Sequence, residues 1–362
     1  MKKVFISPSK YLQGQGELGN LGLYVNSYGK KALFIASRDD QARVQNSLDK
    51  AQELNPFDIV YGSFNEECTK NEIERLIKLS KENDCDVFIG LGGGKALDTA
   101  KAISHFEKKP VIVVPTIAST DAPCSSLAVI YTEHSEFEQY MFFNKNPDLV
   151  LVDTEIIAKA PTRFLVAGMG DALSTYFEAR ACEKSFANNI PGGNSTKAAI
   201  AVAKLCYETL LEDSIKAKAA CDANIVTQAL ENIVEANILL SGLGFESSGL
   251  AAAHAVHDGL TVLEETHKYF HGEKVSFGTI VQLVLENAPS AELKTVLDYC
   301  KSVGLPTCLK DLGIVEVTKE KLMKVAVASC AEGESIHNMP FPVTPEDVYA
   351  AILAADKLGG GK

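Results

Sequence analysis

Four of the seven histidines of the chain lie in one stretch, LAAAHAVHDGLTVLEETHKYFHGEK, residues 250–274. His254 and His257 are three residues apart, and His267 and His271 are four apart. If both segments are helical, each pair lies on one helix face and points into one pocket. Neutral imidazole binds zinc and iron, and two imidazoles with one carboxylate leave a coordination position open for catalysis. The stretch therefore predicts either a catalytic metal site or histidines that pack and form hydrogen bonds in a helical core.

The carboxylate that such a site needs has one good candidate, Asp171 in the sequence GMGDALSTYFEAR. Its neighbours are mostly apolar and have helical spacing, so an unpaired carboxylate here would be costly to bury. A metal ion held together with His254 and His271 would give it a partner. The alternative is that the chain breaks at 168–170 and that Asp171 caps the helix that follows.

The first part of the chain alternates short β-branched runs with amphipathic stretches such as 71–83 and 95–106. This order predicts an α/β domain over residues 1–160, with a parallel sheet whose ligands bind at the carboxyl ends of the strands. A first strand is expected within residues 1–16. The expected strands that follow are 31–37, 57–64, 85–92, 110–116 and 149–154.

From residue 161 on, long segments rich in alanine and leucine show helical spacing. They predict an all-helical domain over residues 161–362, which contains the histidine stretch. Its last helix is expected at 344–357, where Thr344 can cap and Pro345 occupies the first helical position.

Two loops follow neighbouring strands of the expected sheet. The first, Gly92-Gly93-Gly94-Lys95, leads directly into a helix, where glycines let a phosphate approach the backbone and the helix start offers free N–H groups. It matches neither the Walker A pattern, since Ala96 follows the lysine, nor G-x-G-x-x-G. The loop therefore predicts a diphosphate site or a tight turn without a ligand.

The second loop, residues 115–123, carries Thr116, Ser119 and Asp121 at the end of the next strand. In a doubly wound sheet it lies beside the glycine loop. Its hydroxyl groups suit a phosphate or a carboxamide, and the carboxylate suits the hydroxyl groups of a polyol. The alternative is a turn that is stabilised by its own side chains.

Composition excludes several classes of protein. A net charge of −12 gives no electrostatic basis for binding nucleic acid or an anionic membrane, and no apolar run approaches the length of a membrane span. The nine cysteines include no C-x-x-C pair. We therefore expect reduced thiols and a cytoplasmic location.

Further motifs follow one another along the chain: Gly92-Gly93-Gly94-Lys95 with Asp98, Thr116-x-x-Ser119-Thr120-Asp121, Asn146-Pro147-Asp148-Leu149, Gly170-Asp171-Ala172-Leu173, Gly242-Leu243-Gly244-Phe245-Glu246-Ser247, and His254 followed by His271-Gly272. Together these residues resemble the glycerol dehydrogenases of the iron-containing alcohol dehydrogenase superfamily, whose fold is related to that of dehydroquinate synthase. The match runs in order over essentially the whole chain. The resemblance implies a Rossmann-like nucleotide domain, a helical metal-binding domain and an active site in the cleft between them.

The resemblance also implies a reaction and roles for residues. Glycerol or a related 1,2-diol gives a hydride to NAD, yielding dihydroxyacetone and NADH, in an enzyme that forms a homo-oligomer. Asp171, His254 and His271 become the metal ligands, and Asp121 contacts the substrate beside the two histidines. His257 and His267 receive no ligand role. The implied cofactor contacts are Gly92, Gly93, Gly94, Lys95, Asp98, Thr116, Ser119, Ser125, Leu127 and Tyr131.

The sequence departs from the family pattern in two places. Thr175 stands where many iron-dependent relatives have a histidine ligand, so three protein ligands and zinc are expected, with iron left open. Ser37 and Arg38 stand where relatives carry an acidic residue for the adenosine ribose. An arginine there tolerates the phosphate of NADP. We expect NAD, with Asp39 or Asp40 taking over the acidic role, and leave NADP open.

Two other functions fit parts of the pattern. One is an NADPH-dependent reductase of 2-oxo acids from the same superfamily, although Asp121 would repel a substrate that carries a carboxylate. The other is a nucleotide- or metal-binding protein without activity. Such a protein would lack the open metal site or the substrate aspartate.

Overall fold

The computed structural model describes residues 2–134 and 136–361. They form two compact units. The sheet unit consists of Ser7–Thr162 and Ala220–Leu239, and the helical unit of Met1–Ile6, Arg163–Ala219 and Leu240–Lys362. Residues 1–6 thus belong to the helical unit and residues 220–239 to the sheet unit. The continuous domains 1–160 and 161–362 expected from the sequence stay a prediction. Among the described residues, no helix has the length and apolar character to cross a membrane.

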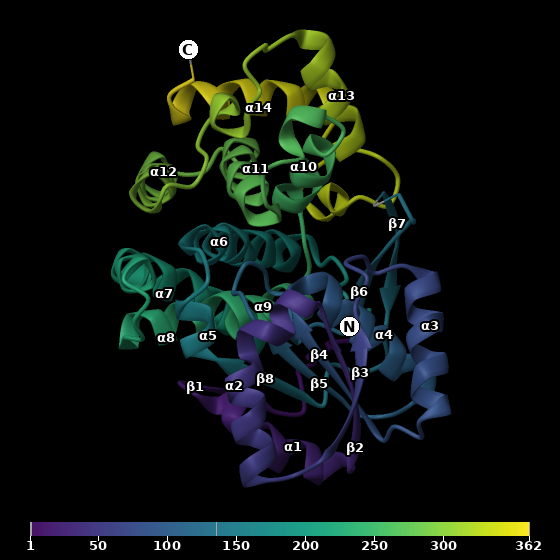
Figure 1. Ribbon diagram of the computed structural model, residues 1–362. Coiled ribbons are helices and arrows are strands. Elements are labelled where there is room, and N and C mark those ends of the chain that lie inside the picture. Colours follow the sequence, from purple (N-terminus) through teal and green to yellow (C-terminus); the bar gives the residue numbers. More distant parts are fainter. Residues whose placement is uncertain (1, 135, 362) are drawn as a thin grey trace. The chain divides into compact units, whose positions relative to one another are not determined.

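Six parallel strands form the core of the sheet unit, in the order β1-β8-β5-β4-β2-β3 (Figure 1). Both the parallel sheet and the five strands expected between residues 31 and 154 are confirmed. Each of these strands ends within two residues of its expected limits. The strands are β1 Tyr11–Gly14, β2 Lys31–Ala36, β3 Asp58–Ser63, β4 Val87–Gly92, β5 Val111–Pro115 and β8 Leu149–Asp153.

Helices cover both faces of this sheet, which explains why its strands are apolar on both sides. On one face Phe34 of β2 packs in a core cluster with Val44 and Leu48. On the other face β4 approaches α4 so closely that a Cβ added to Gly90 would lie 2.6 Å from the Cβ of Ala100. The helices are α1 Leu21–Tyr28 and α2 Arg38–Leu54 on the first face, and α3 Lys70–Glu82 and α4 Gly94–Glu107 on the second.

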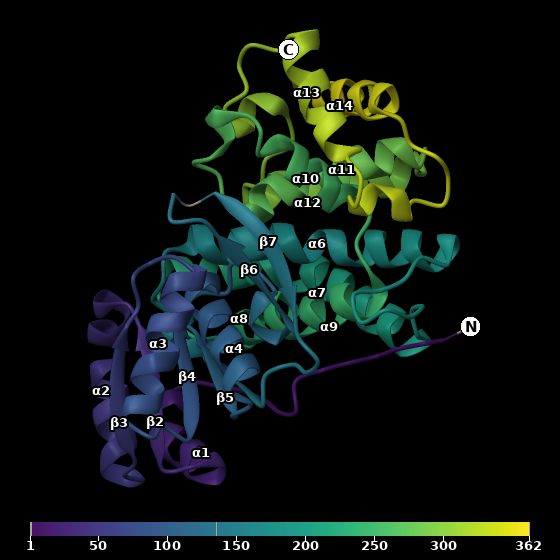
Figure 2. The ribbon, with the colours of Figure 1, turned by 90° about the vertical axis from the view of Figure 1, so that its right-hand side faces the viewer.

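An antiparallel hairpin, β6 Leu127–Tyr131 and β7 Phe137–Phe142, is a feature that the sequence analysis missed (Figure 2). Five of the six residues of β7 are exposed, so the strand lacks the apolar alternation that reveals a buried face. The hairpin is attached to α4 through Asp98, whose Oδ2 accepts a hydrogen bond from the backbone N–H of Val129 at 2.9 Å.

The helical unit contains no strand among its described residues, in agreement with the predicted all-helical second part. Its last helix begins as expected, because the Thr344 hydroxyl accepts a hydrogen bond from the Asp347 N–H at 3.2 Å. The helices are α6 Thr162–Ser185, α7 Lys197–Asp222, α9 Ser241–Ser248, α10 Ala252–Leu260, α11 His271–Leu285, α12 Ser290–Val303, α13 Lys319–Ser329 and α14 Pro345–Gly359. The last residues of α7 and the short helix α8 Gln228–Glu235 belong to the sheet unit.

Candidate metal centre and nucleotide loops

Three helices of the helical unit cross at glycines. A Cβ added to Gly272, in the first turn of α11, would lie 1.8 Å from the carbonyl oxygen of Ala167 in α6. A Cβ added to Gly278, six residues further on, would lie 2.2 Å from the carbonyl oxygen of Ala253 in α10. Such distances are far inside van der Waals contact, so only glycine lets these backbones approach so closely. The crossings bring the start of α11 against the first half of α6, and the middle of α11 against the start of α10.

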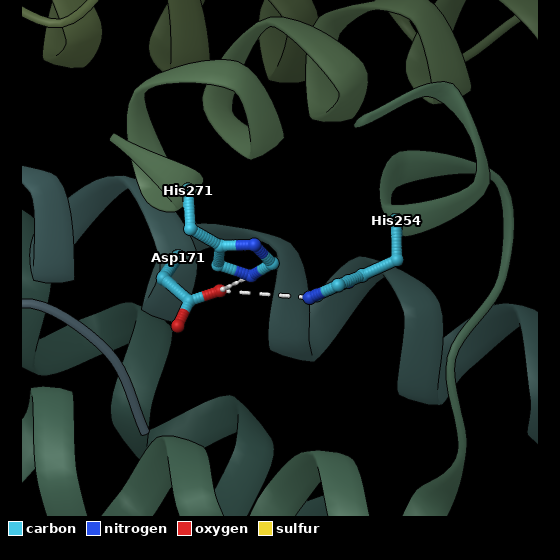
Figure 3. Close-up of side chains that lie close together, drawn as sticks. All are labelled: Asp171, His254 and His271. Atoms are coloured by element: carbon cyan, nitrogen blue, oxygen red, sulfur yellow. Dashed lines mark ion pairs between the residues drawn. The ribbon is translucent and has the colours of Figure 1, made fainter. Parts of the chain in front are cut away.

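Asp171, His254 and His271 come together at these crossings, one from each helix (Figure 3). The Oδ1 atom of Asp171 lies 3.1 Å from Nε2 of His271 and 3.5 Å from Nε2 of His254. Zinc bonds of about 2.0–2.1 Å in tetrahedral geometry place two ligand atoms about 3.3 Å apart. The two distances lie on either side of this value, so the three residues fit a metal ion.

The carboxylate of Asp171 is buried, with 1% of its surface exposed. Because α6 runs without a break from Thr162 to Ser185, Asp171 lies in mid-helix, and the alternative that it caps a helix is wrong. Burial by itself would raise the pKa of Asp171, but electrostatic interactions and hydrogen bonds with His271 and His254 outweigh burial and hold the pKa well below its usual range. The carboxylate is therefore ionised at neutral pH, as a metal ligand must be.

A second buried carboxylate, Glu178, orients His254, and the sequence analysis missed it. Its Oε2 lies 2.6 Å from Nδ1 of His254, and its Oε1 accepts hydrogen bonds from the backbone N–H groups of Ala251 and His254 at 2.8 and 3.0 Å. Glu178 follows Asp171 by seven residues, which is two helical turns, so both point from one face of α6. That spacing is the signal that would have found it.

These contacts set the protonation of His254. Burial disfavours the charged imidazole, but the carboxylates of Glu178 and Asp171 outweigh burial and raise the pKa of His254 well above its usual range. A metal ion therefore competes with a proton for Nε2. The hydrogen bond of Nδ1 to Glu178 directs the lone pair of Nε2 toward Asp171.

The second imidazole, His271, contacts another histidine on the side away from Asp171, where His254 has Glu178. Its Nδ1 lies 3.0 Å from Nε2 of His257, and Nδ1 of His257 lies 2.9 Å from Oδ1 of Asp258. Burial and the nearby charge of His271 lower the pKa of His257 to about 3, so His257 is neutral at physiological pH. His254 and His257 share helix α10, as their spacing predicts.

The expected helical pairing of His267 with His271 is wrong. Helix α11 begins at His271, and His267 ends a short 3₁₀ turn, Glu264–Thr266. There its Nε2 lies 2.9 Å from the carbonyl oxygen of Thr261 on the surface of the helical unit. Four-residue spacing alone did not reveal that the chain turns between these two histidines.

In the sheet unit, the glycine loop lies where the sequence analysis expects it. β4 ends at Gly92, whose φ of +142° favours glycine, and α4 begins at Gly94. A Cβ on Gly94 would meet no other described atom within 4 Å, and one on Gly93 would meet only the side chain of Ile117, at 3.5 Å. Open space thus borders the first N–H groups of a 14-residue helix, which is the geometry that binds phosphate.

The second loop lies beside the first, again as expected. The backbone N–H of Thr116 donates to the carbonyl oxygen of Gly92 at 3.0 Å. The hairpin strand β6 ends at the same place, since Nζ of Lys95 lies 4.9 Å from the ring centre of Tyr131. Ser119, in the second loop, and Leu127, the first residue of β6, are partly exposed. Asp121 is 9% exposed and directly precedes the 3₁₀ turn Ala122–Cys124.

Two residues of the implied cofactor set point into the protein. Oδ1 of Asp98 lies 2.9 Å from Nζ of the buried Lys101. The hydroxyl of Ser125 is buried and donates to the carbonyl oxygen of Ala122 at 3.0 Å. These contacts hold the hairpin and its preceding loop on α4. A direct contact of either side chain with a cofactor stays a prediction.

Of the two acidic residues after β2, Asp40 is the one that faces the glycine loop and the loop that begins at Thr116. Ser37 caps α2, and its hydroxyl donates to Oδ2 of Asp40 at 2.8 Å. The same Oδ2 lies 3.2 Å from the place of a Cβ on Gly92, and Oδ1 accepts from the Thr116 hydroxyl at 3.4 Å. Arg38 and Asp39 are exposed.

Comparison with known proteins agrees with this geometry. Residues 8–154 match the family described as iron-containing alcohol dehydrogenase. The chain is 55% identical over 361 residues to a glycerol dehydrogenase of Citrobacter freundii, covering 99% of this chain and 98% of the relative. It is 51% identical over 363 residues to a glycerol dehydrogenase of Pseudomonas putida, covering 99% and 98%. The crystal structure of glycerol dehydrogenase from Schizosaccharomyces pombe superimposes with a TM-score of 0.95 at 39% identity, covering 99% of this chain and 91% of that one. The chain therefore belongs to the iron-containing alcohol dehydrogenase family.

Proposed function

We propose that the protein is a metal- and NAD-dependent glycerol dehydrogenase. It moves a hydride from the secondary carbinol of glycerol, or of a related 1,2-diol, to NAD, and yields dihydroxyacetone, NADH and a proton. The observation that carries the proposal is the convergence of Asp171, His254 and His271 on one point in a member of an alcohol dehydrogenase family. Relatives that are half identical over their full length and bear the name glycerol dehydrogenase support the substrate.

Each residue of the proposed metal site has its own role. A divalent ion held there supplies a positive charge that lowers the pKa of an alcohol. Asp171 neutralises one unit of that charge, and the two neutral imidazoles leave the second unit in place. Glu178 keeps His254 facing the ion. With three protein ligands a fourth position stays open, which is the catalytic rather than the structural arrangement.

Zinc is the metal that we propose for this site. Thr175, one turn after Asp171, occupies the place of the additional histidine ligand of many iron-dependent relatives. Its hydroxyl is buried and lies 2.8 Å from the hydroxyl of Ser241, so it is engaged inside the helical unit. Three ligands of mixed oxygen and nitrogen type suit catalytic zinc.

NAD rather than NADP is the proposed cofactor because of Asp40. Its carboxylate borders the glycine loop, where it can accept hydrogen bonds from a ribose and repel a 2′-phosphate. We expect Asp40→Asn to lower kcat/KM for NAD about tenfold, the effect of losing a charge-assisted hydrogen bond. The preference for NAD over NADP should fall as well.

The matched control for this prediction is Asp39→Asn, which removes an equal charge from an exposed neighbour. Initial rates with both cofactors measure the preference for each variant. A preference that moves in Asp39→Asn and stays fixed in Asp40→Asn would give the role to Asp39.

Asp121 is proposed to accept hydrogen bonds from the hydroxyl groups of the polyol. We expect Asp121→Ala to lower kcat/KM for glycerol about 10–100-fold, the range for losing one hydrogen bond to a charged group. Activity with 1-propanol, which has a single hydroxyl group, should change little. An equal loss with both alcohols in steady-state assays would remove Asp121 from substrate recognition.

The NADPH-dependent oxo-acid reductase remains the second candidate. Arg38 is the first residue of α2, just after β2, and an arginine at this place tolerates the phosphate of NADP. Measuring nicotinamide reduction or oxidation with glycerol and lactate, each with NAD and NADP, separates the candidates. We expect glycerol with NAD to be the preferred pair by a wide margin. Preference for lactate with NADP would transfer the assignment to the oxo-acid reductase, and inactivity in every pairing would favour a binding protein. A homo-oligomer in the cytoplasm is part of the same proposal.

A further inference from the structure

We infer that His257 and Asp258 are positioning residues that hold His271 in the tautomer a metal ligand needs. The inference rests on the proposed metal-dependent function, and it gives a role to a histidine–aspartate pair outside the ligand set. The pair forms one hydrogen-bonded chain with His271, from Nδ1 of His271 through the ring of His257 to Oδ1 of Asp258.

Donor and acceptor requirements give this chain a single direction. Nε2 of His271 faces Asp171 at 3.1 Å, so this nitrogen must carry the lone pair and Nδ1 must carry the proton when a metal binds. Nε2 of His257 must then accept that proton at 3.0 Å, which leaves Nδ1 of His257 as its protonated nitrogen. That N–H in turn donates to Oδ1 of Asp258 at 2.9 Å. Because a carboxylate only accepts, Asp258 fixes the tautomers of both rings.

The surroundings of His257 keep the ring in place. Its side chain is 11% exposed, and its ring packs edge-on against that of His271, with centres 4.2 Å apart and planes at 65°. The crossing of α10 and α11 at Gly278 sets the distance between the helices that carry the two rings. On the side away from Asp171, His257 thus both packs against the ring of His271 and supplies the hydrogen-bond acceptor for its Nδ1.

The two ligand histidines are oriented by different means. His254, with a side chain 13% exposed, bonds directly to the buried Glu178. His271, with a side chain 36% exposed, bonds to the pair of His257 and Asp258. The more exposed ring has more freedom to turn toward solvent. It is therefore the ring for which an additional acceptor matters most.

Four variants of the full-length protein test the inference. His257→Leu removes the acceptor and keeps an apolar side chain in the pocket, whereas His257→Gln keeps an oxygen that can accept from His271. Asp258→Ala removes the last acceptor, whereas Asp258→Asn keeps one. His267→Leu is the control, because it removes a surface histidine of the same segment.

The readouts are zinc affinity, from competition with a chromophoric chelator, and the visible spectrum of the cobalt-substituted protein. Loss of an outer hydrogen-bond partner of a ligand histidine weakens metal binding about 10–100-fold. We expect that loss, with an altered cobalt spectrum, in His257→Leu and Asp258→Ala. His257→Gln, Asp258→Asn and His267→Leu should stay close to the unmodified protein.

The outcomes separate this inference from the proposed function. If the unmodified protein binds one zinc ion and oxidises glycerol while all the variants bind zinc equally well, the positioning role is overturned and the function stands. Equal losses in His257→Leu and His257→Gln would also overturn it, since they would assign the effect to ring packing. If the unmodified protein binds no zinc, the proposed metal site fails and the inference fails with it.

Discussion

Replacing Asp171, His254 or His271 by alanine is expected to abolish stoichiometric zinc binding and nearly all glycerol oxidation. In the proposed site each residue supplies one of three protein ligands, and two remaining ligands are too few to hold zinc at the concentrations of an assay. Loss of the ion removes several kcal/mol of charge stabilisation, which corresponds to a decrease in kcat/KM of about a thousandfold or more. Metal analysis of the purified variants and initial rates of NADH formation measure the two effects.

His267→Ala is the matched control for these three substitutions, because His267 belongs to the same histidine-rich stretch and lies on the surface. It should retain one zinc ion per chain and full activity. A variant of Asp171, His254 or His271 that keeps both its metal and its rate would remove that residue from the ligand set. Asp171→Asn refines the test, since it preserves size and removes the charge.

Gly272→Ala is expected to destabilise the helical unit and to disturb the metal site together. The added methyl group would lie 1.8 Å from the carbonyl oxygen of Ala167 and 2.7 Å from the backbone nitrogen of Asp171. These neighbours are backbone atoms, so relief requires α6 and α11 to move apart. Overpacking of this kind costs about 2–4 kcal/mol, equivalent to a decrease in Tm of about 5–12 °C. Zinc affinity should fall in parallel, because Asp171 and His271 lie on opposite sides of the contact.

Gly304→Ala separates this steric effect from the loss of a glycine as such. Gly304 has φ +89°, and a Cβ there would meet no other described atom within 4 Å. Its substitution should cost about 1 kcal/mol of backbone strain and leave zinc affinity unchanged. Thermal unfolding and zinc competition on both variants provide the measurement. Equal stability and affinity in Gly272→Ala and the unmodified protein would contradict the close crossing of α6 and α11.

Local sequence patterns were sufficient to predict much of the architecture. Strands such as β4 and β5 are short runs with β-branched residues, bounded by glycine or proline. The start of the last helix could be predicted from its capping residue, Thr344, and from Pro345. The hairpin strand β7 was missed because it is largely exposed. Such a strand lacks the alternating apolar residues by which a strand is predicted. The turn between His267 and His271 was also missed, since the spacing of the two residues equally fits a continuous helix.

The proposed metal centre could be predicted from the sequence only in part. Asp171 drew attention because a carboxylate in an apolar helix needs a partner. Glu178 did not, because its burial and its contact with His254 depend on how α6 and α10 pack. The approach of Gly272 to Ala167 joins segments about a hundred residues apart, and no local pattern reveals such a contact. The types of the candidate ligands could therefore be predicted from the sequence, whereas the residues that orient them could be identified only from the fold.

The most direct test of the account is a zinc titration of metal-depleted protein, with formation of NADH from glycerol and NAD followed by absorbance. We expect the depleted protein to be almost inactive and the rate to rise linearly with added zinc until one ion is bound per chain. Protein carrying Asp171→Ala should not respond. Full activity of the depleted protein, or a rate that zinc leaves unchanged while the protein remains folded, would contradict a catalytic metal at Asp171, His254 and His271.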